Sequence, residues 1–268
     1  MNAASAAEPT SPGGQAEELL VGGNVNRVVR IGDTVRRPAG PWTPAVHALL
    51  THLHGAGFPA PRPFGIDEQG REVLSFVPGE VVWPDHFDTV APADRLARVG
   101  RLVRDFHDAV EGFVPPPDAR WNALIPADGA DLIIHHDLAP WNLVVDAADG
   151  WTLIDWDAAA PGTRLWDLAY AAHGFVPLSA DPRFQVWDTR ARLRVLVDAY
   201  GLDEAQRRAL VPMLSVRARS MYDLLATESA AGREPWSTLW REGHGQIWSD
   251  DADWIGRREA DWLAVLLG

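Results

Sequence analysis

Short segments with strand-like patterning fill the first part of the chain and are separated by turn-forming residues. The expected strands cover residues 17–22, 26–31, 34–37, 61–67 and 71–77. Between them lie Gly22-Gly23-Asn24, Gly32-Asp33 and Glu68-Gln69-Gly70, whose residue types favour tight turns. The pattern predicts an antiparallel meander.

One helix is expected within this β-rich region, after Trp42. Apolar side chains recur at helical spacing at Val46, Leu49, Leu50 and Leu53. Thr43 is expected as the N-cap, Pro44 as the first helical residue, and Gly55 or Gly57 as the end. The histidines of this helix are expected on its solvated face, namely His47, His52 and His54.

Beyond Pro78-Gly79 the patterning becomes mainly helical. Two β segments, within residues 132–145 and 151–156, flank an irregular loop. Helices are predicted over residues 92–110, 165–174, 184–199, 204–228 and 253–267. The chain is therefore expected to have an α+β fold made of a disordered tail (residues 1–15), a β-rich lobe (16–77) and a mainly helical lobe (78–268).

Composition narrows the range of functions. The 268 residues include 37 acidic and 24 basic side chains, and the formal net charge of −13 disfavours nucleic acid and membrane surfaces as partners. The chain has no Cys, no signal-peptide pattern at its start and no uninterrupted run of about 18 apolar residues, so a cytoplasmic protein is expected. All of the basic residues are Arg, so any task that usually needs Lys must use Arg.

The stretch from Ile134 to Asp157 carries the candidate chemistry. Asp137 and Asn142 lie five residues apart on the expected loop, and Asp155 follows the hydrophobic segment after the turn at 147–150. Phosphoryl transfer needs one carboxylate to orient the attacking hydroxyl and accept its proton, and oxygen ligands to hold Mg²⁺ across the nucleotide phosphates. Asp137 fits the first task, and Asn142 and Asp155 fit the second.

These residues resemble the motifs of the aminoglycoside phosphotransferase and choline kinase-like family, whose catalytic loop is H-G-D-x-x-x-x-N and whose metal aspartate follows in an I-D-[FW] segment. The matching positions are His135, Asp137, Asn142, Ile154, Asp155 and Trp156. The resemblance implies a protein-kinase-like two-lobe fold, a phosphoryl donor that is ATP or GTP, Mg²⁺, and a small hydroxyl-bearing acceptor. It also implies that Asp137 is the catalytic base, that Asn142 and Asp155 bind the metal, that His135 is structural and that Asp167 tethers the catalytic loop.

The chain departs from the family pattern at two places. His136 stands where the family has Gly. The family also places a Lys on the third strand and pairs it with a Glu from the helix, whereas this chain has only Arg36 and Arg37 there and no acidic residue between Thr43 and Ile66. Strand alternation favours Arg37 as the inward-facing phosphate contact, with Arg36 facing outward.

Further nucleotide contacts are expected in the β-rich lobe. Gly22 and Gly23 form either a phosphate-covering loop or a plain hairpin turn. Backbone groups at the end of the last strand are expected to bond the purine, at Ser75, Phe76 and Val77. Asp157 is either a further metal or substrate contact or a loop-stabilising residue. Trp83 and Trp141 are expected near the substrate path, and zinc at His135 and His136 is disfavoured because no clear third ligand accompanies them.

Three functions remain open at this level. The favoured one is O-phosphorylation of an aminoglycoside-like antibiotic, to which acidic C-terminal residues would attract a cationic substrate. These residues are Asp198, Asp203, Glu204, Asp223, Glu228, Glu234, Asp250, Asp251 and Asp253. The second is a metabolic kinase acting on choline, a sugar or an amino-acid alcohol. The third is a non-catalytic nucleotide-binding protein, which the missing Lys–Glu pair favours and the intact Asp137, Asn142 and Asp155 disfavour.

Overall fold

A five-stranded sheet forms the first lobe in a computed structural model, which describes residues 17–20 and 28–268. Its strand order is β1-β2-β3-β5-β4, and neighbouring strands are antiparallel. The strands are β1 (Glu18–Leu19), β2 (Val29–Ile31), β3 (Thr34–Pro38), β4 (Pro63–Ile66) and β5 (Arg71–Ser75). The expected tail of residues 1–15 and the expected turn at Gly22 and Gly23 lie outside the described residues.

The helix of this lobe, α1 (Thr43–Gly55), ends at Gly55 as predicted but begins one residue early. Trp42 is the N-cap residue, so the prediction that Thr43 caps the helix was wrong. The Thr43 hydroxyl accepts a hydrogen bond from the Gly40 N–H at 2.9 Å and thereby stabilises the preceding turn. The four apolar residues at helical spacing, Val46, Leu49, Leu50 and Leu53, are all fully buried.

The chain leaves the sheet after Ser75 and joins the second lobe through β6 (Glu80–Val81). Strand β6 pairs with β8 (Leu143–Val145), which pairs in turn with β9 (Trp151–Leu153). Gly79 permits this approach because its φ is 129° and a Cβ there would lie 2.5 Å from the Val145 carbonyl oxygen. A strand of two residues has no periodicity, which is why β6 was not predicted. β7 (Leu132–Ile134) pairs with β10 (Ala160–Gly162) as a second short antiparallel pair, and the irregular loop that contains Asp137 begins directly after β7.

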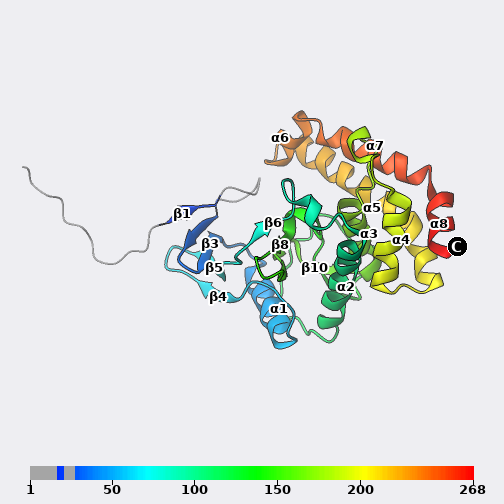
Figure 1. Cartoon of the computed structure of the whole chain (residues 1–268). Helices are drawn as coiled ribbons and strands as arrows, with labels where there is room; N and C mark the ends of the chain where they lie inside the picture. The colour runs from blue at the N-terminus through cyan, green and yellow to red at the C-terminus, as the bar shows by residue number, and fades with distance from the viewer. Residues whose placement is uncertain (1–16, 21–27) are drawn as a thin grey trace, which may run out of the picture.

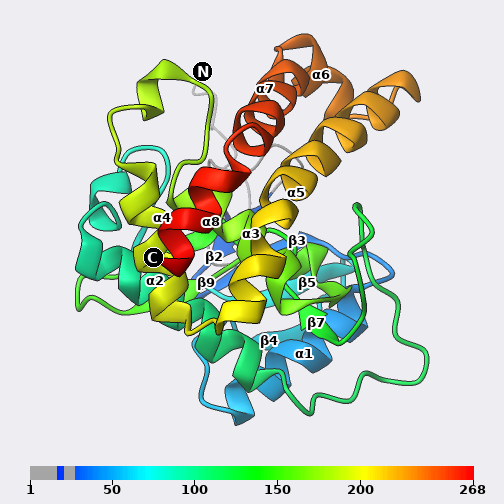
Figure 2. The same cartoon turned by 90° about the vertical axis from the view of Figure 1, so that its right-hand side faces the viewer.

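The remaining elements are mainly helical, and Figure 1 shows them on the opposite side of β6 and β8 from the sheet. They are α2 (Ala93–Ala109), α3 (Arg164–Phe175), α4 (Thr189–Tyr200), α5 (Glu204–Ala230), α6 (Trp236–Arg241), α7 (His244–Gly256) and α8 (Glu259–Leu267). Single 3₁₀ turns cover Phe87–Thr89, Pro140–Asn142, Trp156–Ala158 and Pro182–Phe184. Helices α5 and α7 run side by side in Figure 2. None of the helices described combines the length and the apolar composition that crossing a bilayer requires.

Two predicted helices have different boundaries. Helix α4 begins at Thr189 and not at residue 184, because Asp188 caps it by accepting the Ala191 N–H at 3.1 Å. The helix predicted over residues 253–267 is divided between α7 and α8, with Arg257 and Arg258 between them. Helix α6 and most of α7 were not predicted.

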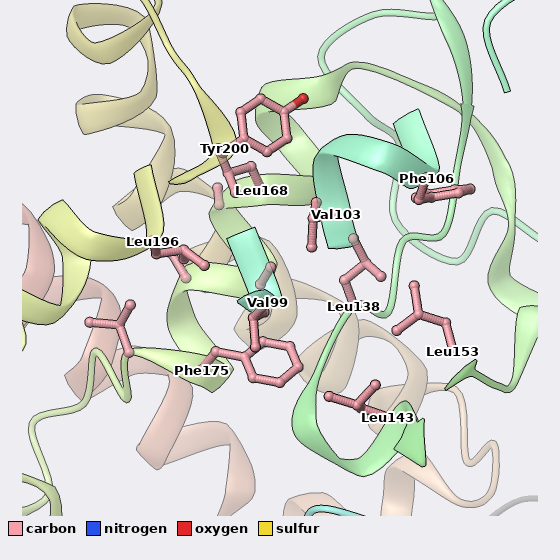
Figure 3. Close-up of a cluster of buried hydrophobic side chains, with 14 of the residues drawn as sticks. Val99, Val103, Phe106, Leu138, Leu143, Leu153, Leu168, Phe175, Leu196 and Tyr200 are labelled. Carbon is pink, nitrogen blue, oxygen red and sulfur yellow. The ribbon is translucent and has the colours of Figure 1, made fainter. Parts of the chain in front are cut away.

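The core of the second lobe lies directly beneath the irregular loop. Figure 3 shows Val99, Val103 and Phe106 of α2 facing Leu138, Leu143 and Leu153. All six are at most 1% exposed. Burying side chains of this size favours the folded chain by about 1.5–3 kcal/mol each. Leu138 directly follows Asp137 in the chain. Its burial therefore fixes the loop backbone beside Asp137.

Candidate active site

The irregular loop between β7 and β8 presents Asp137 with its carboxylate held by neighbours. The Asn142 side-chain amide donates to Asp137 Oδ2 at 2.7 Å and to the Asp137 carbonyl at 2.9 Å. The Trp141 indole N–H also points to Oδ2, at 3.4 Å. A carboxylate fixed in this way keeps acceptor capacity for one more donor, such as a substrate hydroxyl.

Asp167, in the first turn of α3, holds the start of the loop. Its carboxylate accepts the backbone N–H groups of His135 and His136, both at 2.9 Å. Burial acts to raise the pKa of Asp167, but the hydrogen bond from His107 and the nearby histidines outweigh it and lower that pKa. The residue is therefore a buried anion whose two oxygens are satisfied by the loop.

The two histidines of the loop are held differently. His135 Nε2 lies 3.0 Å from the Ile154 carbonyl, and its ring lies against Trp156 at 4.6 Å between centroids. His136 has a φ of 65°, a left-handed conformation that is costly for a residue with a side chain. A left-handed backbone is the conformation that Gly adopts most readily, so a Gly would fit this position without strain, and this chain adopts it with His.

Asp155 and Asp157 meet the first lobe through Arg37. The Arg37 guanidinium lies 2.8 Å from Asp155 Oδ1 and 2.6 Å from Asp157 Oδ1. Burial raises the pKa of Asp157 to about 6 despite the Arg37 charge. Burial alone would lower the pKa of Arg37, but Asp157, Glu72 and Asp155 raise it. Arg37 is buried and inward-facing, whereas Arg36 lies 3.6 Å from Asp67.

Glu72 and His47 complete this network, and sequence reasoning missed both. Glu72 Oε2 accepts from Arg37 Nε at 2.5 Å, and Oε1 lies 2.9 Å from His47 Nε2. Arg37 and Glu72 are cross-strand partners on β3 and β5. The sequence offered one signal for Glu72: it is an acidic residue directly before the apolar pair Val73-Leu74 of a predicted strand, where a carboxylate needs a partner.

The expectation that the helix histidines face solvent was wrong for two of the three. His47 bonds Glu72, and His52 Nε2 lies 2.8 Å from the Ala109 carbonyl. Only His54 is exposed. Polar partners on β5 and α2 therefore hold these two histidines of α1, which are half-buried.

The expected purine-binding segment lies at the end of β5. The Ser75 N–H donates to the Arg62 carbonyl and the Phe76 N–H to the Asp33 carbonyl, both at 2.8 Å. The Arg30 guanidinium lies over the Phe76 ring, 3.9 Å from the ring centroid. Val77 is half-buried. The two amides before Val77 are thus already engaged within the protein.

The donor set of the loop suits Mg²⁺. Asn142 and Asp155 flank the β8–β9 hairpin, and the Ile154 N–H donates to the Asn142 carbonyl at 2.9 Å. Among the described residues, no three His, Cys, Asp or Glu side chains gather in a metal-binding group. Mg²⁺ is commonly held by one or two protein oxygens together with phosphate oxygens and water, so a carboxylate and an amide fit its chemistry.

Aromatic side chains from distant segments gather beside Asp137. The rings of Trp141 and Tyr170 are nearly perpendicular at 6.3 Å, and Trp248 of α7 stacks on Tyr170 at 6.1 Å. Tyr170 is buried, and burial, followed by the charge of Asp137, raises its pKa well above the usual value. Trp83 packs against Phe87 and Phe184. The separation of these residues along the chain explains why only Trp141 was found from the sequence.

Most of the acidic C-terminal residues are already neutralised by partners. Asp198, Glu204, Glu228, Glu234 and Asp253 form ion pairs with Arg. Asp203 caps α5, and Asp251 is buried against Ser179 and His173. These carboxylates therefore have partners within the protein, and the attraction of a cationic substrate by them stays a prediction.

A β lobe with one helix, a mainly helical lobe and the loop at their junction define a two-lobe kinase-like phosphotransferase. The chain belongs to the phosphotransferase enzyme family, whose model matches residues 17–124 and 117–210. It is accordingly a phosphotransferase with an alcohol group as acceptor.

Three known proteins are similar to this chain in sequence or in fold. The trifolitoxin immunity protein of Rhizobium leguminosarum bv. trifolii is 33% identical over 243 residues, which cover 84% of this chain and 92% of that protein. A microcompartment-associated aminopropanol kinase has a similar structure, with a TM-score of 0.63, 16% identity and coverage of 93% of this chain and 94% of that one. An ADP-bound aminoglycoside phosphotransferase gives a TM-score of 0.57 at 9% identity, covering 93% and 95% of the two chains.

Proposed function

We propose that the protein transfers the γ-phosphoryl group of ATP or GTP to a hydroxyl of a small antibiotic or toxin, in the cytoplasm. The observation that carries this proposal is the Asp137 carboxylate, oriented by Asn142 and Trp141 beside the hairpin that ends in Asp155. The acceptor hydroxyl gives its proton to Asp137 as its oxygen attacks the γ-phosphorus. The bond from that phosphorus to the nucleoside diphosphate breaks.

The nucleotide site in this proposal uses groups from both lobes. Asn142 and Asp155 hold Mg²⁺, which neutralises charge on the phosphates. Arg37 contacts phosphate oxygens, since a guanidinium forms strong charge-assisted bonds to them. Val77, at the chain crossing between the lobes, offers its backbone to the purine. Pro78-Gly79 remains the proposed boundary between the lobes.

The similarity of this chain to an immunity protein and to an aminoglycoside phosphotransferase favours an antibiotic or toxin as the acceptor. The relative that is 33% identical over most of its length is an immunity protein against trifolitoxin, and an aminoglycoside phosphotransferase shares the fold. Phosphorylation adds about −1.5 to −2 charges at neutral pH, so it changes both the shape and the charge that a toxin presents to its target.

A metabolic amino-alcohol kinase is the second candidate, and the aromatic group beside Asp137 favours it. Trp141, Tyr170 and Trp248 present ring faces and edges close to a carboxylate. A protonated amine placed against such rings gains about 0.5–2 kcal/mol. Phosphate-transfer assays on aminopropanol, ethanolamine and choline, run beside an aminoglycoside panel, distinguish the two candidates.

Replacing Asp137 tests the reaction itself and separates the enzyme from a non-catalytic nucleotide-binding protein. Asp137→Asn keeps the size and polarity of the side chain while removing the base. We expect kcat to fall by at least about 100-fold. Calorimetry should show little change in Mg·ATP affinity.

Asp131→Asn is the matched control, because Asp131 is an exposed aspartate just before β7. It should leave turnover unchanged. An Asp137→Asn variant that melts at a lower temperature but keeps its turnover would show that Asp137 is only a loop-stabilising residue.

A further inference from the structure

Arg217, on α5, is a buried cation that the phosphate-transfer scheme does not use. It is 2% exposed, and its guanidinium forms no ion pair with a carboxylate among residues 17–20 and 28–268. Its Nε has no hydrogen-bond partner in this part of the chain. A buried guanidinium is costly unless its surroundings compensate the charge. The charges of Asp137 and Asp167 favour the charged form of Arg217 although neither forms a direct ion pair with it, and Nη1 donates to the Ser220 hydroxyl at 3.1 Å.

The contacts of Arg217 lead to the catalytic loop from two directions. Its Nη2 donates to the His136 carbonyl at 2.9 Å, directly before Asp137 in the chain. Its planar group lies 4.2 Å above the Tyr170 ring and 5.3 Å from Trp166. The Tyr170 ring in turn lies 6.3 Å from the ring of Trp141, whose indole N–H points to Asp137 Oδ2. Burial raises the pKa of Tyr170, and Tyr170 is also close enough to Asp137 for the charge of that carboxylate to raise this pKa further. One side chain therefore touches both the backbone before Asp137 and the aromatic residue beside its carboxylate.

The backbone at the first contact is in a high-energy conformation. His136 has a positive φ, which residues with side chains rarely adopt. Such conformations persist only where the surroundings hold them, and they often set the geometry of a functional site. Asp167 holds the His136 N–H, and Arg217 holds its carbonyl. The two peptide units that flank the His136 Cα, including the one that leads into Asp137, are thus each held by a side chain.

We propose that Arg217 is a positioning residue for Asp137, holding the His136 carbonyl and the Tyr170 ring so that the carboxylate faces the acceptor hydroxyl. This inference rests on the proposed phosphotransfer. It connects α5 of the helical lobe to the chemistry of the loop.

The chain contains a matched control in Arg192, on α4. Arg192 is also buried, donates to two backbone carbonyls (Ala91 and Phe175), and lies 4.8 Å from the Trp187 ring. Its Nε likewise has no partner among the described residues. Within the part of the chain that the structure describes, Arg192 forms no hydrogen bond or cation–π contact with residues 135–142, so it shares the burial of Arg217 but not its proposed function.

The experiment compares Arg217→Met with Arg192→Met, using Mg·ATP with water as the acceptor and measuring phosphate release below the melting temperature of each variant. We expect both variants to melt earlier than the wild type. Arg217→Met should lower kcat at least about 10-fold with the KM for ATP within about 2-fold, and Arg192→Met should retain kcat. Arg217→Lys, which keeps the charge and a donor, should recover part of the rate and provides a variant that folds if Arg217→Met does not.

Two further measurements show whether the effect comes from positioning. Tyr170→Phe should lower kcat as well, and the double variant with Arg217→Met should lose less than the product of the two single effects, because both act on Asp137. A crystal structure of Arg217→Met should show His136 leaving its positive φ and Asp137 separating from Asn142, with neither change in Arg192→Met.

Equal losses of kcat in Arg217→Met and Arg192→Met, or wild-type kcat in Arg217→Met, would overturn the inference. If the wild-type protein releases no phosphate and modifies no acceptor, the proposed function fails. The crystal structures then decide the role of Arg217 separately, since an unmoved His136 in Arg217→Met contradicts it.

Discussion

At the scale of single residues, the Arg37 guanidinium is shared by three carboxylates, those of Glu72, Asp155 and Asp157. Only this inward-facing Arg of β3 can reach a phosphate held near Asp155. We predict that Arg37→Ala weakens Mg·ATP binding by at least about 10-fold, because charge-assisted bonds to phosphate are lost. Calorimetric titration measures the change.

Arg36→Ala is the control for this prediction, since Arg36 lies on the same strand but bonds Thr34 and lies near Asp67. Its affinity for Mg·ATP should stay within about 2-fold of the wild type. Equal and negligible effects of both substitutions would mean that neither Arg contacts the phosphates.

Glu72 is the buried anion that anchors Arg37, and its loss should affect stability. Burial acts to raise the pKa of Glu72, but His47 and then Arg37 outweigh it and lower the pKa below its usual 4.5. Glu72→Gln should lower the free energy of unfolding by about 2 kcal/mol at pH 7, the usual scale for hydrogen bonds to a charged group. Urea denaturation measures this difference.

The direction of the Glu72 pKa shift predicts how the stability difference between the wild type and Glu72→Gln depends on pH. A lowered carboxylate pKa stabilises the folded state above the unfolded pKa, and this stabilisation is lost as the pH falls through the folded pKa. The difference between the wild type and Glu72→Gln should therefore shrink below about pH 4.5. Glu68→Gln, on an exposed turn, should show no such difference at any pH. A gap that stays constant down to pH 3 would contradict the ionised Glu72.

At the scale of elements, the β8–β9 hairpin is attached to α2 through its turn. The Asp149 carboxylate accepts two hydrogen bonds from Arg95, at 2.6 and 2.7 Å, and one from Arg98, at 2.7 Å. Both guanidinium groups lie over the Trp151 ring. Arg95, then Trp151 and Arg98, hold the pKa of Asp149 well below its usual range. Since this hairpin carries Asn142 and Asp155 at its two ends, the attachment also positions the proposed metal site.

Asp149→Asn tests that attachment. Asn tolerates the positive φ of 64° at this position, so the substitution removes mainly the charge. We predict a melting temperature lower by about 1–2 °C at pH 7 in low salt, an effect that salt screens. Because the pKa is lowered, the difference should start to shrink as the pH falls below the unfolded value of 3.8, and it is lost only as the pH falls through the folded-state pKa. Asp85→Asn, at an exposed position, is the control, and an unchanged melting temperature in Asp149→Asn would show that the hairpin is held by packing alone.

At the scale of the whole molecule, the proposed nucleotide contacts both lobes and should stabilise them together. A ligand present at about 100 times its Kd adds about 2.7 kcal/mol of stability. For a chain of this size we expect the melting temperature to rise by about 5–10 °C with Mg·ATP. Differential scanning fluorimetry measures the shift.

Removing the metal provides the comparison. ATP with EDTA should give a much smaller rise, and Asp155→Ala should lose the metal-dependent part of the stabilisation. If ATP stabilises the protein equally with and without Mg²⁺, Asn142 and Asp155 do not form a metal site.

Much of the fold was predictable because its signals are local. The apolar spacing in α1 and α2 follows from one amphipathic face, α3 and α5 are stretches of mostly helix-compatible residues, and the turns of the sheet follow from Gly and Asp. Strands β6 and β10 and helix α6 are too short for such a signal, and the break between α7 and α8 has no Pro or Gly pair to mark it. A further error was the assignment of Thr43 as the N-cap of α1, because its hydroxyl bonds the turn before the helix.

The sequence by itself determined the local unit that brings Asp137, Asn142 and Asp155 together, because loop and hairpin contacts between near neighbours follow from residue type and spacing. Only the tertiary structure decided which distant groups surround this unit. Glu72 meets Arg37 through strand pairing, whereas helix packing brings Arg217 to the His136 carbonyl and Trp248 to Tyr170. Contacts of that kind depend on how the buried faces fit against each other, and this fit leaves no periodic trace along the chain.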